Sequence, residues 1–262
     1  MLSTPEACVA YECDALTAHR HPPDLVALPT SVEQVQQIVR ACRRHSVPVV
    51  ARGSGTGLSG GALPVAGGLL LVLSRLAAIL EVDPRRGLAR VQPGVTNLAV
   101  SEAAAPYGMY YAPDPSSQVA CSVGGNVAEN SGGVHCLKYG LTVHNVLAVK
   151  LVTMEGELLT LGSETGEAPG LNLLAAVIGS EGLLGVVVEV TVRLLPIPRR
   201  VELLLAAFDD VGRCAEAVGQ VIAAGIIPAG LEMMDAPAIR AAEAFAGCGY
   251  PLDAQALLLC EI

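Results

Sequence analysis

Glycine-rich segments hold most of the residues whose types suit ligand binding. The first is Arg52 followed by the run GSGTGLSGG, which ends at Gly61. Consecutive glycines lack Cβ atoms, so several backbone N–H groups can converge on one anion, an arrangement that suits a pyrophosphate. Arg52 adds a fixed positive charge at the start of the run. The sequence therefore predicts an anion-binding loop, and the alternative is a flexible loop without a ligand.

The same run contains two known motifs in the wrong context. Gly55 to Gly60 spells G-x-G-x-x-G, but a dinucleotide-binding fingerprint must open a helix, and the following GALPVAGG does not predict one. Gly57 to Gly61 spells G-x-S-x-G, but a nucleophilic serine needs a strand, a tight turn and a helix around it. The sequence also lacks a G-x-x-x-x-G-K-[ST] motif. We therefore expect neither a Rossmann site, nor a serine hydrolase, nor a P-loop.

Three further segments offer polar groups to a ligand: one is a rigid proline turn with hydroxyls, and two combine glycines with hydroxyl, amide or carboxylate groups. They are PDPSS from Pro113, SVGGNVAENSGG from Ser122, and GSEGLLG from Gly179. The first two lie in a stretch from 107 to 145 that has little periodicity. Structureless segments longer than about 15 residues are uncommon in compact domains unless they bind something. Four such segments on one framework predict a long ligand with phosphates and a flat ring system.

Hydrophobic periodicity predicts the elements that position these segments. Ser31 and Gln34 form a capping-box signature at the start of a helix, and Glu155-Gly156 indicates a hairpin turn. Along a strand from Leu183, polar residues at 189, 191 and 193 alternate with valines, which predicts one solvated face. Strands are expected at 25–28, 47–51, 69–73, 79–83, 88–92, 146–153, 157–161, from Leu183, 201–208, 229–233 and 256–261, and helices at 31–45, 97–105, 171–178, 210–224 and 236–246.

Composition excludes several classes of protein. The 262 residues are 52% hydrophobic and 16% charged, so a large folded core is expected. A net charge of −9 disfavours a nucleic-acid partner. Mean hydropathy is +0.52, yet no apolar run reaches the roughly 18 residues of a membrane span. The N-terminus lacks the features of a signal peptide, so we expect a cytoplasmic protein.

The cysteines and histidines do not predict a metal site. Eight cysteines occur without a C-x-x-C pair, and five histidines are scattered. In a chain without an export signal, buried reduced thiols are the expected state of the cysteines.

Shifts in composition predict two domains after a short N-terminal segment. Residues 1–24 form a polar lead-in, 25–199 form the first domain, and 200–262 begin a second after Pro196 and Pro198. The apolar strand 256–261 has no element after it, which would leave a face or an edge unburied. We therefore expect further chain or a partner to complete the second domain.

Several strings, taken in order, resemble one family. They are YECD at 11–14, RGSGTGLSGG, PDPSS, SVGGNVAENSGG, CLKYG and GSEGLLG. They resemble the FAD-binding domain of the vanillyl-alcohol oxidase type (PCMH-like), as found in the FAD-linked subunit of glycolate oxidase and in D-lactate and D-2-hydroxyglutarate dehydrogenases. The resemblance covers about residues 10–262. It implies an α+β fold: an FAD-binding domain of two α+β subdomains, followed by an α+β cap domain of which 200–262 is the first part.

The resemblance also implies which residues hold FAD. Some relatives attach FAD covalently through a His beside the pyrophosphate loop, where this sequence has Thr56, so we expect non-covalent FAD. The implied cofactor-binding residues are Arg52, Gly53, Ser54, Gly55, Thr56, Gly57, Ser59 and Gly60 at the pyrophosphate; Pro113, Asp114, Pro115, Ser116, Cys121, Val123, Gly124, Gly125, Asn126, Ala128 and Glu129 at the flavin and ribityl chain; Gly132, Gly133, Tyr139 and Gly140 in the supporting wall; and Glu181, Gly182 and Val187 toward the adenosine.

The activity implied is oxidation of a small 2-hydroxy acid, such as glycolate or D-lactate. Hydride passes from the α-carbon to flavin N5 while a base takes the hydroxyl proton. In the family the acid-binding and basic residues lie largely in the later cap, so no catalytic residue is assigned here. His135 and His144 are expected to be solvated or hydrogen-bonded, with a role as catalytic base as the alternative. Glu232 is a candidate for a first cap residue that faces the site.

The resemblance further implies partners, and it leaves two alternatives open. Relatives often pass electrons to iron–sulfur subunits or to quinone. We therefore expect flavin and iron–sulfur partner subunits, and either a cytoplasmic location or a peripheral one at the inner membrane through those subunits. The first alternative is a catalytically incomplete FAD-binding fragment or interaction module. The second is another flavoenzyme of the same fold, such as an NADPH-dependent reductase of cell-wall precursors.

Overall fold

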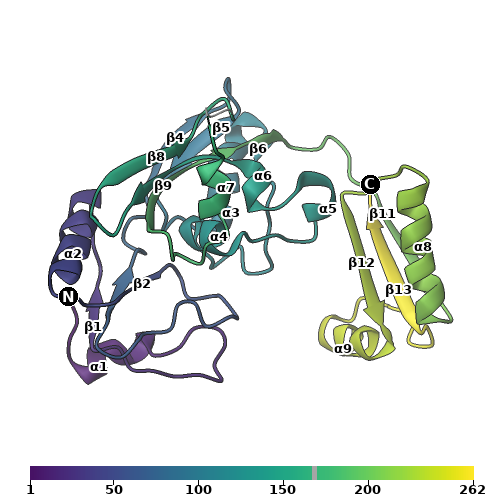
Figure 1. Ribbon diagram of the computed structural model, residues 1–262. Coiled ribbons are helices and arrows are strands. Elements are labelled where there is room, and N and C mark those ends of the chain that lie inside the picture. Colours follow the sequence, from purple (N-terminus) through teal and green to yellow (C-terminus); the bar gives the residue numbers. More distant parts are fainter. Residues whose placement is uncertain (167–169) are drawn as a thin grey trace. The chain divides into compact units, whose positions relative to one another are not determined.

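A computed structural model describes residues 1–166 and 170–262, and the chain divides into two compact units (Figure 1). Unit 1 comprises Met1–Ser131 and Leu141–Ile197. Unit 2 comprises Gly132–Gly140 and Pro198–Ile262. No sheet is shared between the units among the described residues, and each unit has its own hydrophobic clusters. The α+β content expected from the sequence is confirmed.

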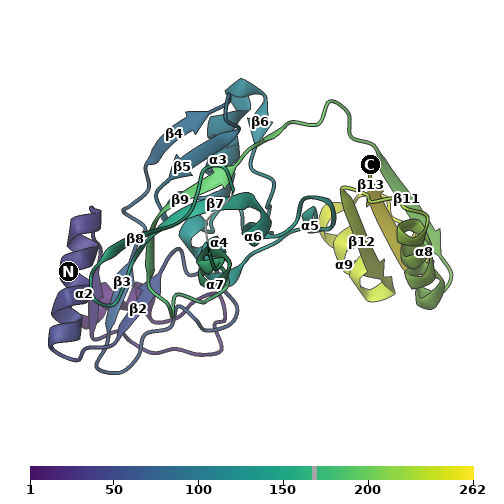
Figure 2. The same ribbon diagram turned by 45° about the horizontal axis from the view of Figure 1, so that its top comes forward.

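Unit 1 begins with a small parallel sheet. Its strands are β1 (Leu25–Ala27), β3 (Leu69–Val72) and β2 (Val49–Arg52), in that order, with β3 in the centre. Helix α2 (Val32–Arg44) lies alongside these strands in Figure 1 and Figure 2. Its apolar stripe packs into the same cluster as the inward side chains of β3, which include the fully buried Leu71. The sequence prediction of this β-α-β start is therefore confirmed.

The other face of the small sheet is covered by the N-terminal segment. Helix α1 (Pro5–Cys8) and a 3₁₀ turn (Val9–Tyr11) pack there. Cys8 and Tyr11 join the buried side chains of Val26, Leu70 and Val72. The N-terminal segment is therefore built into the core of unit 1.

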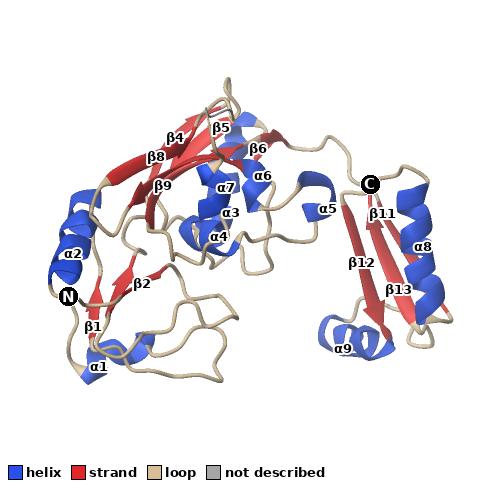
Figure 3. Cartoon of the chain, in the orientation of Figure 1, coloured by secondary structure: helices blue, strands red, loops and turns tan. Residues whose placement is uncertain are grey.

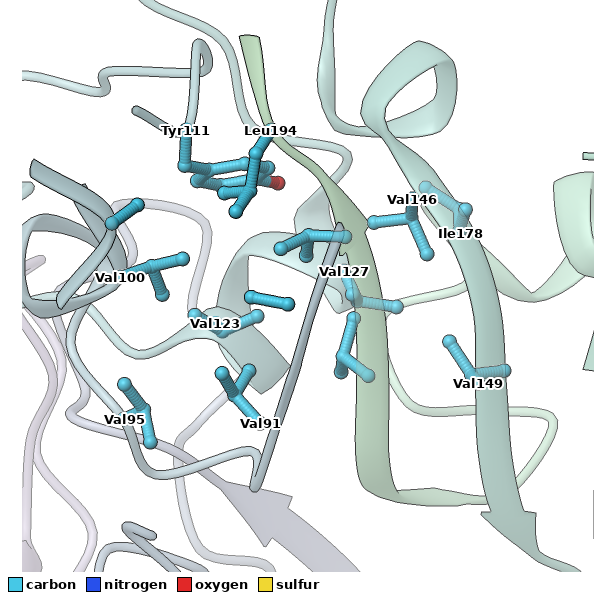
Figure 4. Packing of buried hydrophobic residues seen from close by; sticks show 14 of the residues in the cluster. Val91, Val95, Val100, Tyr111, Val123, Val127, Val146, Val149, Ile178 and Leu194 are labelled. Carbon is cyan, nitrogen blue, oxygen red and sulfur yellow. The ribbon is translucent and has the colours of Figure 1, made fainter. Parts of the chain in front are cut away.

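A five-stranded antiparallel sheet is the largest sheet of unit 1 among the described residues. Its order is β4 (Ile79–Asp83), β5 (Leu88–Val91), β9 (Val186–Arg193), β7 (Val146–Val152) and β8 (Leu158–Gly162). Side chains of α3 (Asn97–Ala104), α4 (Val123–Glu129) and α7 (Leu173–Val177) fill the cluster on one face. Figure 4 shows Val100 and Val123 packed together with Val91 in this core.

The opposite face of this sheet carries polar side chains, but they are less exposed to solvent than the alternation of polar residues and valines along β9 predicts. Arg90 pairs with Glu81 and Glu189, and Lys150 pairs with Glu189 at 3.0 Å. Thr191, which the sequence placed on a wet face, is only 5% exposed. It lies opposite Arg90 in the ladder, and this network of long side chains shields it from water.

The stretch 107–145 is more ordered than its lack of periodicity predicted, so that expectation is wrong. It contains β6 (Met109–Tyr110), which pairs with β10 (Leu195–Pro196), the seven-residue helix α4, and the short helices α5 (Cys136–Tyr139) and α6 (Thr142–Asn145). Ser122 caps α4 by accepting the N–H of Gly125 at 3.4 Å. Helix propensity does not predict α4, because Gly124 and Gly125 are poor helix formers.

The predicted bounds near α7 and β9 also need correction. The strand begins at Val186 rather than at Leu183, and the helix covers 173–177 rather than 171–178. Gly182 and Gly185 have φ values of +76° and +147°, so this segment forms a turn instead of extending the strand. The side chain of Leu183 is 84% exposed.

Unit 2 contains a three-stranded antiparallel sheet with two longer helices. The strand order is β11 (Leu203–Phe208), β13 (Ala256–Glu261) and β12 (Gly230–Asp235). Helix α8 (Val211–Ala223) packs Cys214 against Ala256 and Leu258, and α9 (Ala236–Ala246) packs Ile239 against Leu257. These five elements were expected from the sequence within two residues at each end.

The expectation of an unburied edge at strand 256–261 is wrong. β13 is the central strand, and both of its edges are paired, one with β11 and one with β12. The exposed apolar side chains lie on β11 instead, where Leu203, Leu204 and Leu205 are 65%, 54% and 46% exposed.

Two further expectations concern the burial of the cysteine thiols and the presence of membrane-spanning segments. All eight thiols are free and five of them are buried, but Cys136 and Cys248 are exposed, which the prediction of buried thiols missed. Among the residues that the structure describes, no helix is both long enough and apolar enough to cross a membrane.

Candidate cofactor site

Three of the glycine-rich segments meet around one cavity in unit 1. Its lining comes from the loop after β2, from the turn and helix between Ser117 and Ser131, and from the turn between Ser180 and Gly185. Figure 3 shows the chain that follows β2 as loop. Its backbone N–H and C=O groups therefore do not take part in the hydrogen bonds of a helix or a strand. Segments far apart in the sequence thus form one surface.

Backbone hydrogen bonds join the segments. Gly179 N–H donates to the carbonyl of Val127 at 2.8 Å, and Glu181 N–H donates to that of Ala128 at 2.9 Å, which fixes the third segment to the last turn of α4. Glu181 has a φ of +53°, an unusual conformation for a residue other than glycine. The turn therefore has a defined position against α4.

The glycines of the first loop have distinct roles. A Cβ on Gly53 would lie 2.2 Å from the Oγ of Ser122, so glycine allows the first loop to approach the cap of α4. Gly55 has a φ of +72°, and a Cβ there would lie 2.3 Å from Nη2 of Arg52. A Cβ on Gly57 would meet no atom within 4 Å. Gly57 thus borders open space in the cavity, where a ligand can approach the backbone.

Arg52 lies beneath this loop and is only 8% exposed. Its Nη1 donates to the carbonyl of Ala62 at 3.2 Å, and its guanidinium lies 5.9 Å from the centre of the Tyr11 ring. Burial lowers the pKa of Arg52, and the facing Asp14, Cys13 and Tyr11 oppose that shift. Arginine stays charged in proteins, so the cavity has a fixed cation in its wall.

Asn126 on α4 carries an unsatisfied donor. Its side chain is 2% exposed, and its Oδ1 accepts the hydroxyl of Ser131 at 3.4 Å. Its Nδ2 is buried without a hydrogen-bond partner among the described residues. Buried polar groups are rarely left unpaired, and Asn126 lines the cavity, so this amide indicates a ligand acceptor.

Two carboxylates flank Gly61 in the wall of the cavity. A Cβ built on Gly61 would lie 3.4 Å from Oε1 of Glu129 and 3.9 Å from Oε2 of Glu181. Partial burial raises the pKa of Glu129, and repulsion from Glu181 and Asp14 raises it further. Both side chains remain accessible to solvent, so they add negative charge at the opening of the site.

The structure brings many of the sequence-predicted residues to this cavity. Those that line it are Arg52, Gly53, Ser54, Gly55, Thr56, Gly57, Cys121, Gly124, Gly125, Asn126, Ala128, Glu129, Glu181, Gly182 and Val187. Those outside its lining are Ser59, Gly60, Pro113, Asp114, Pro115, Ser116, Val123, Gly132, Gly133, Tyr139 and Gly140. Val123 is fully buried in the core, and Gly132, Gly133, Tyr139 and Gly140 belong to unit 2.

Sequence reasoning missed other lining residues. Ser122 and Ser180 stand inside the quoted strings and could have been chosen as hydroxyl donors beside glycines. Leu73 and Pro93 follow strands and also line the cavity. Nothing in their type or spacing marks them, because tertiary packing alone brings them there.

The two histidines considered as bases have hydrogen-bond partners. His144 accepts the N–H of Leu141 through Nδ1 at 3.0 Å. His135 Nε2 lies 3.1 Å from Oε1 of Glu261 within unit 2. Among the described residues, no group of three or more His, Cys, Asp or Glu side chains could hold a metal ion.

The residues present fit FAD. The cavity offers an open glycine loop and a buried arginine for the pyrophosphate, and an unpaired amide donor on α4 for a polar group. It defines a class of protein that binds a phosphate-bearing cofactor in irregular loops of an α+β unit.

Comparison with known families identifies the class more closely. The family described as FAD binding domain matches residues 23–162, and the family described as FAD linked oxidases, C-terminal domain, matches residues 197–262. The chain belongs to the FAD binding domain family, and FAD is its cofactor. The expected fold and the resemblance seen in the sequence are confirmed.

Individual relatives agree with this assignment. The chain is 60% identical over all 262 residues to glycolate oxidase subunit GlcD of Escherichia coli (strain K12), and covers 52% of that protein. It is 40% identical over 254 residues, 97% of its length, to glycolate oxidase subunit GlcD of Bacillus subtilis (strain 168), and covers 54% of that protein. It is 34% identical over 226 residues, 86% of its length, to the D-lactate dehydrogenase of Anaerostipes hadrus, and covers 47% of that protein. The chain thus spans about half the length of these relatives.

A solved structure supports the fold alone. An alkyldihydroxyacetonephosphate synthase superposes with a TM-score of 0.83 over 100% of this chain and 52% of its own, at 22% identity.

Proposed function

We propose that this chain supplies the FAD site of an oxidoreductase that converts a small 2-hydroxy acid, of the glycolate or D-lactate type, to the 2-oxo acid. The observation that carries the proposal is the cavity where three glycine-rich segments meet, in a chain 60% identical to a glycolate oxidase subunit. The flavin, when bound, supplies the hydride acceptor at N5.

The chain's own residues have binding and orienting roles in this proposal. The backbone N–H groups from Gly53 to Gly57 and the guanidinium of Arg52 hold the pyrophosphate. The amide of Asn126 donates to a polar group of the cofactor and thereby satisfies its unpaired Nδ2. The other lining residues from Cys121 to Glu129, with Glu181, Gly182 and Val187, complete the wall.

FAD is held without a covalent bond in this proposal. Thr56 lines the cavity, and a threonine hydroxyl is a poor nucleophile without an activating base. Acid precipitation of the reconstituted protein is expected to release all of the flavin into the supernatant. Flavin that stays with the precipitate would contradict this proposal.

The domain assignment belongs to the same proposal. Residues 1–24 are the lead-in, 25–199 the FAD-binding domain, and 200–262 the first part of a substrate-covering cap. The match of residues 197–262 to the C-terminal domain of FAD linked oxidases supports the last of these. Flavin and iron–sulfur partner subunits, and a cytoplasmic or peripheral membrane location, are proposed because two relatives are named as glycolate oxidase subunits.

The activity is tested by anaerobic reduction of the bound flavin. The full-length protein that contains this chain is expected to lose its visible flavin absorbance when glycolate or D-lactate is added, and L-lactate serves as the control. The 262-residue chain is tested beside it. If the chain binds FAD but is not bleached while the longer protein is, the chain alone is an FAD-binding module. If neither protein is bleached, the proposed activity is wrong.

FAD affinity is expected to fall as pH rises, through Glu129. The pyrophosphate brings more negative charge to a carboxyl whose pKa is already raised, so FAD binding takes up a proton there. FAD affinity is highest at pH values below the pKa of Glu129 in the cofactor-free protein. It falls by up to about tenfold per pH unit between that pKa and the higher pKa of the complex, then levels off.

Titration calorimetry in buffers of different ionisation enthalpy measures this proton uptake. Glu129→Gln removes the titrating group and is expected to flatten the pH profile. Glu102→Gln, at an exposed residue of α3 outside the cavity lining, is the matched control. A pH profile that is the same in Glu129→Gln and in the wild type would contradict this prediction.

A further inference from the structure

The YECD motif at Tyr11–Asp14, in the N-terminal lead-in, lies against the glycine loop. Ala15 N–H donates to the carbonyl of Gly55 at 3.0 Å, which ties the N-terminal segment directly to the loop. Tyr11 lies under the guanidinium of Arg52 and also packs on the buried side chains of the small sheet. The motif thus connects the loop with a rigid core.

Asp14 is a buried carboxylate in this arrangement. Its side chain is 5% exposed, and Oδ1 accepts the N–H of Leu16 at 2.9 Å. Oδ2 is buried without a hydrogen-bond partner among the described residues. A buried carboxylate is costly unless a positive charge compensates it, and the charge of Asp14 acts on the guanidinium of Arg52, which lies over the ring of the neighbouring Tyr11.

Arg52 in turn supports the loop from below. Its Nη1 bonds to the carbonyl of Ala62 at one end of the loop, and its Nη2 occupies the space where a Cβ of Gly55 would lie. The guanidinium therefore touches the loop at two points. The Tyr11 ring lies below the guanidinium, and the negative charge of Asp14 attracts it.

We propose that Asp14 is a positioning residue of the FAD site, which acts through Arg52 to hold the loop from Gly53 to Ala62 in its binding conformation. The proposal rests on the proposed contact between this loop and the pyrophosphate of FAD. A loop that is ordered before binding does not draw on the binding free energy to become ordered, so the electrostatic attraction between Asp14 and Arg52 raises affinity although Asp14 does not touch the cofactor.

A double-mutant cycle tests whether Asp14 acts through Arg52. The four proteins are the wild type, Asp14→Asn, Arg52→Met and the double variant, and the measured quantity is the Kd for FAD. Asn keeps the acceptor for Leu16 N–H, removes the charge and replaces the buried Oδ2 by an amide donor of similar size. Asp14→Asn is expected to raise the Kd roughly tenfold when Arg52 is present, and less than about twofold in the Arg52→Met background, because coupled residues are not additive. Equal factors in both backgrounds, or no effect in either, would overturn the proposal.

Hydrogen exchange of the cofactor-free protein supplies a second readout. The amides from Gly53 to Ala62 are expected to exchange faster in Asp14→Asn, while those of β3 in the core keep their protection. Asp14→Glu keeps the charge and is expected to restore part of the affinity if Asp14→Asn folds poorly. Asp24→Asn is the matched control, because Asp24 also accepts a backbone N–H, that of Gly67, but is exposed. Unchanged exchange in the loop of Asp14→Asn would overturn the proposal.

The double-mutant cycle also distinguishes failure of the proposed role of Asp14 from failure of the proposed contacts between the loop and FAD. If Arg52→Met leaves the Kd for FAD unchanged, the loop is not the pyrophosphate site and the proposed contacts fail. If Arg52→Met raises the Kd and Asp14→Asn does not, only the role of Asp14 fails.

Discussion

Replacement of Gly57 by valine is expected to prevent FAD binding while the protein stays folded. Gly57 lines the cavity, its φ lies outside the left-handed region, and a Cβ there would meet no atom within 4 Å. The folded chain therefore tolerates a side chain at this position, and the free energy of unfolding is expected to change by less than about 0.5 kcal/mol. The valine would occupy the space proposed for the pyrophosphate. The Kd for FAD is expected to rise at least about 100-fold, which corresponds to about 2.7 kcal/mol.

Calorimetric titration with FAD and urea unfolding of the cofactor-free protein measure the two effects. Gly57→Ala is expected to give an intermediate Kd, because it adds one carbon to the same space. Gly219→Val is the control: Gly219 also borders open space, but it lies on α8 of unit 2 and is expected to leave the Kd unchanged. A wild-type Kd in Gly57→Val would show that FAD does not occupy the space beside Gly57.

Alanine is expected to have opposite effects on stability at two helical glycines. Intrinsic propensity favours alanine over glycine in a helix interior by up to about 1 kcal/mol. At Gly219 no atom lies near the new Cβ, so Gly219→Ala should stabilise unit 2 by about 0.5 to 1 kcal/mol. At Gly124 the new Cβ would lie 2.6 Å from the Cβ of Pro93 and 3.1 Å from its carbonyl oxygen. The steric cost of overpacking, about 1 to 3 kcal/mol, exceeds the gain in propensity.

Gly124→Ala should therefore destabilise unit 1 and also weaken FAD binding. The N–H of Gly124 donates to the same Pro93 carbonyl at 2.8 Å, so the helix cannot move away without losing this bond. A shift of α4 would displace Gly125 and Asn126 in the cavity wall. Calorimetric unfolding and FAD titration of both variants measure these effects. Stabilisation of unit 1 by Gly124→Ala would contradict the packing argument.

Much of the fold follows from the sequence because its elements have clear periodicity. The apolar stripe of α2 specifies one buried face, the apolar runs of β3 and β7 specify strands buried on both faces, and these elements lie where they were expected. Helix α4 was missed because its two glycines serve close packing against Pro93 and Ser122 rather than helix formation. The central place of β13 could not be predicted either, since periodicity defines a strand but not its neighbours in a sheet.

The candidate site was predicted in part for a similar reason. Glycine loops such as that from Gly53 to Gly57 are visible as strings, because a backbone that binds an anion needs consecutive residues without Cβ atoms. The location of Arg52 beneath the loop, rather than only at its start, brings it into contact with Tyr11 and Ala62, and nothing in the sequence relates these distant residues to it. The two carboxylates of Glu129 and Glu181 likewise come close together only because backbone hydrogen bonds join α4 to the 179–182 turn.

The central place of β13 also governs when the sheet of unit 2 can form during synthesis. β11 and β12 emerge from the ribosome first, but both pair with β13 and not with each other. Until residues 256–261 are translated, the two earlier strands have unpaired backbone edges, and β11 also carries Leu203, Leu204 and Leu205. Such nascent strands are prone to incorrect pairing, and long-range pairing is slow. The vulnerable period of biosynthesis therefore lasts from the translation of β11 to that of β13, a span of about 50 residues that takes a few seconds at roughly 5 to 20 residues per second.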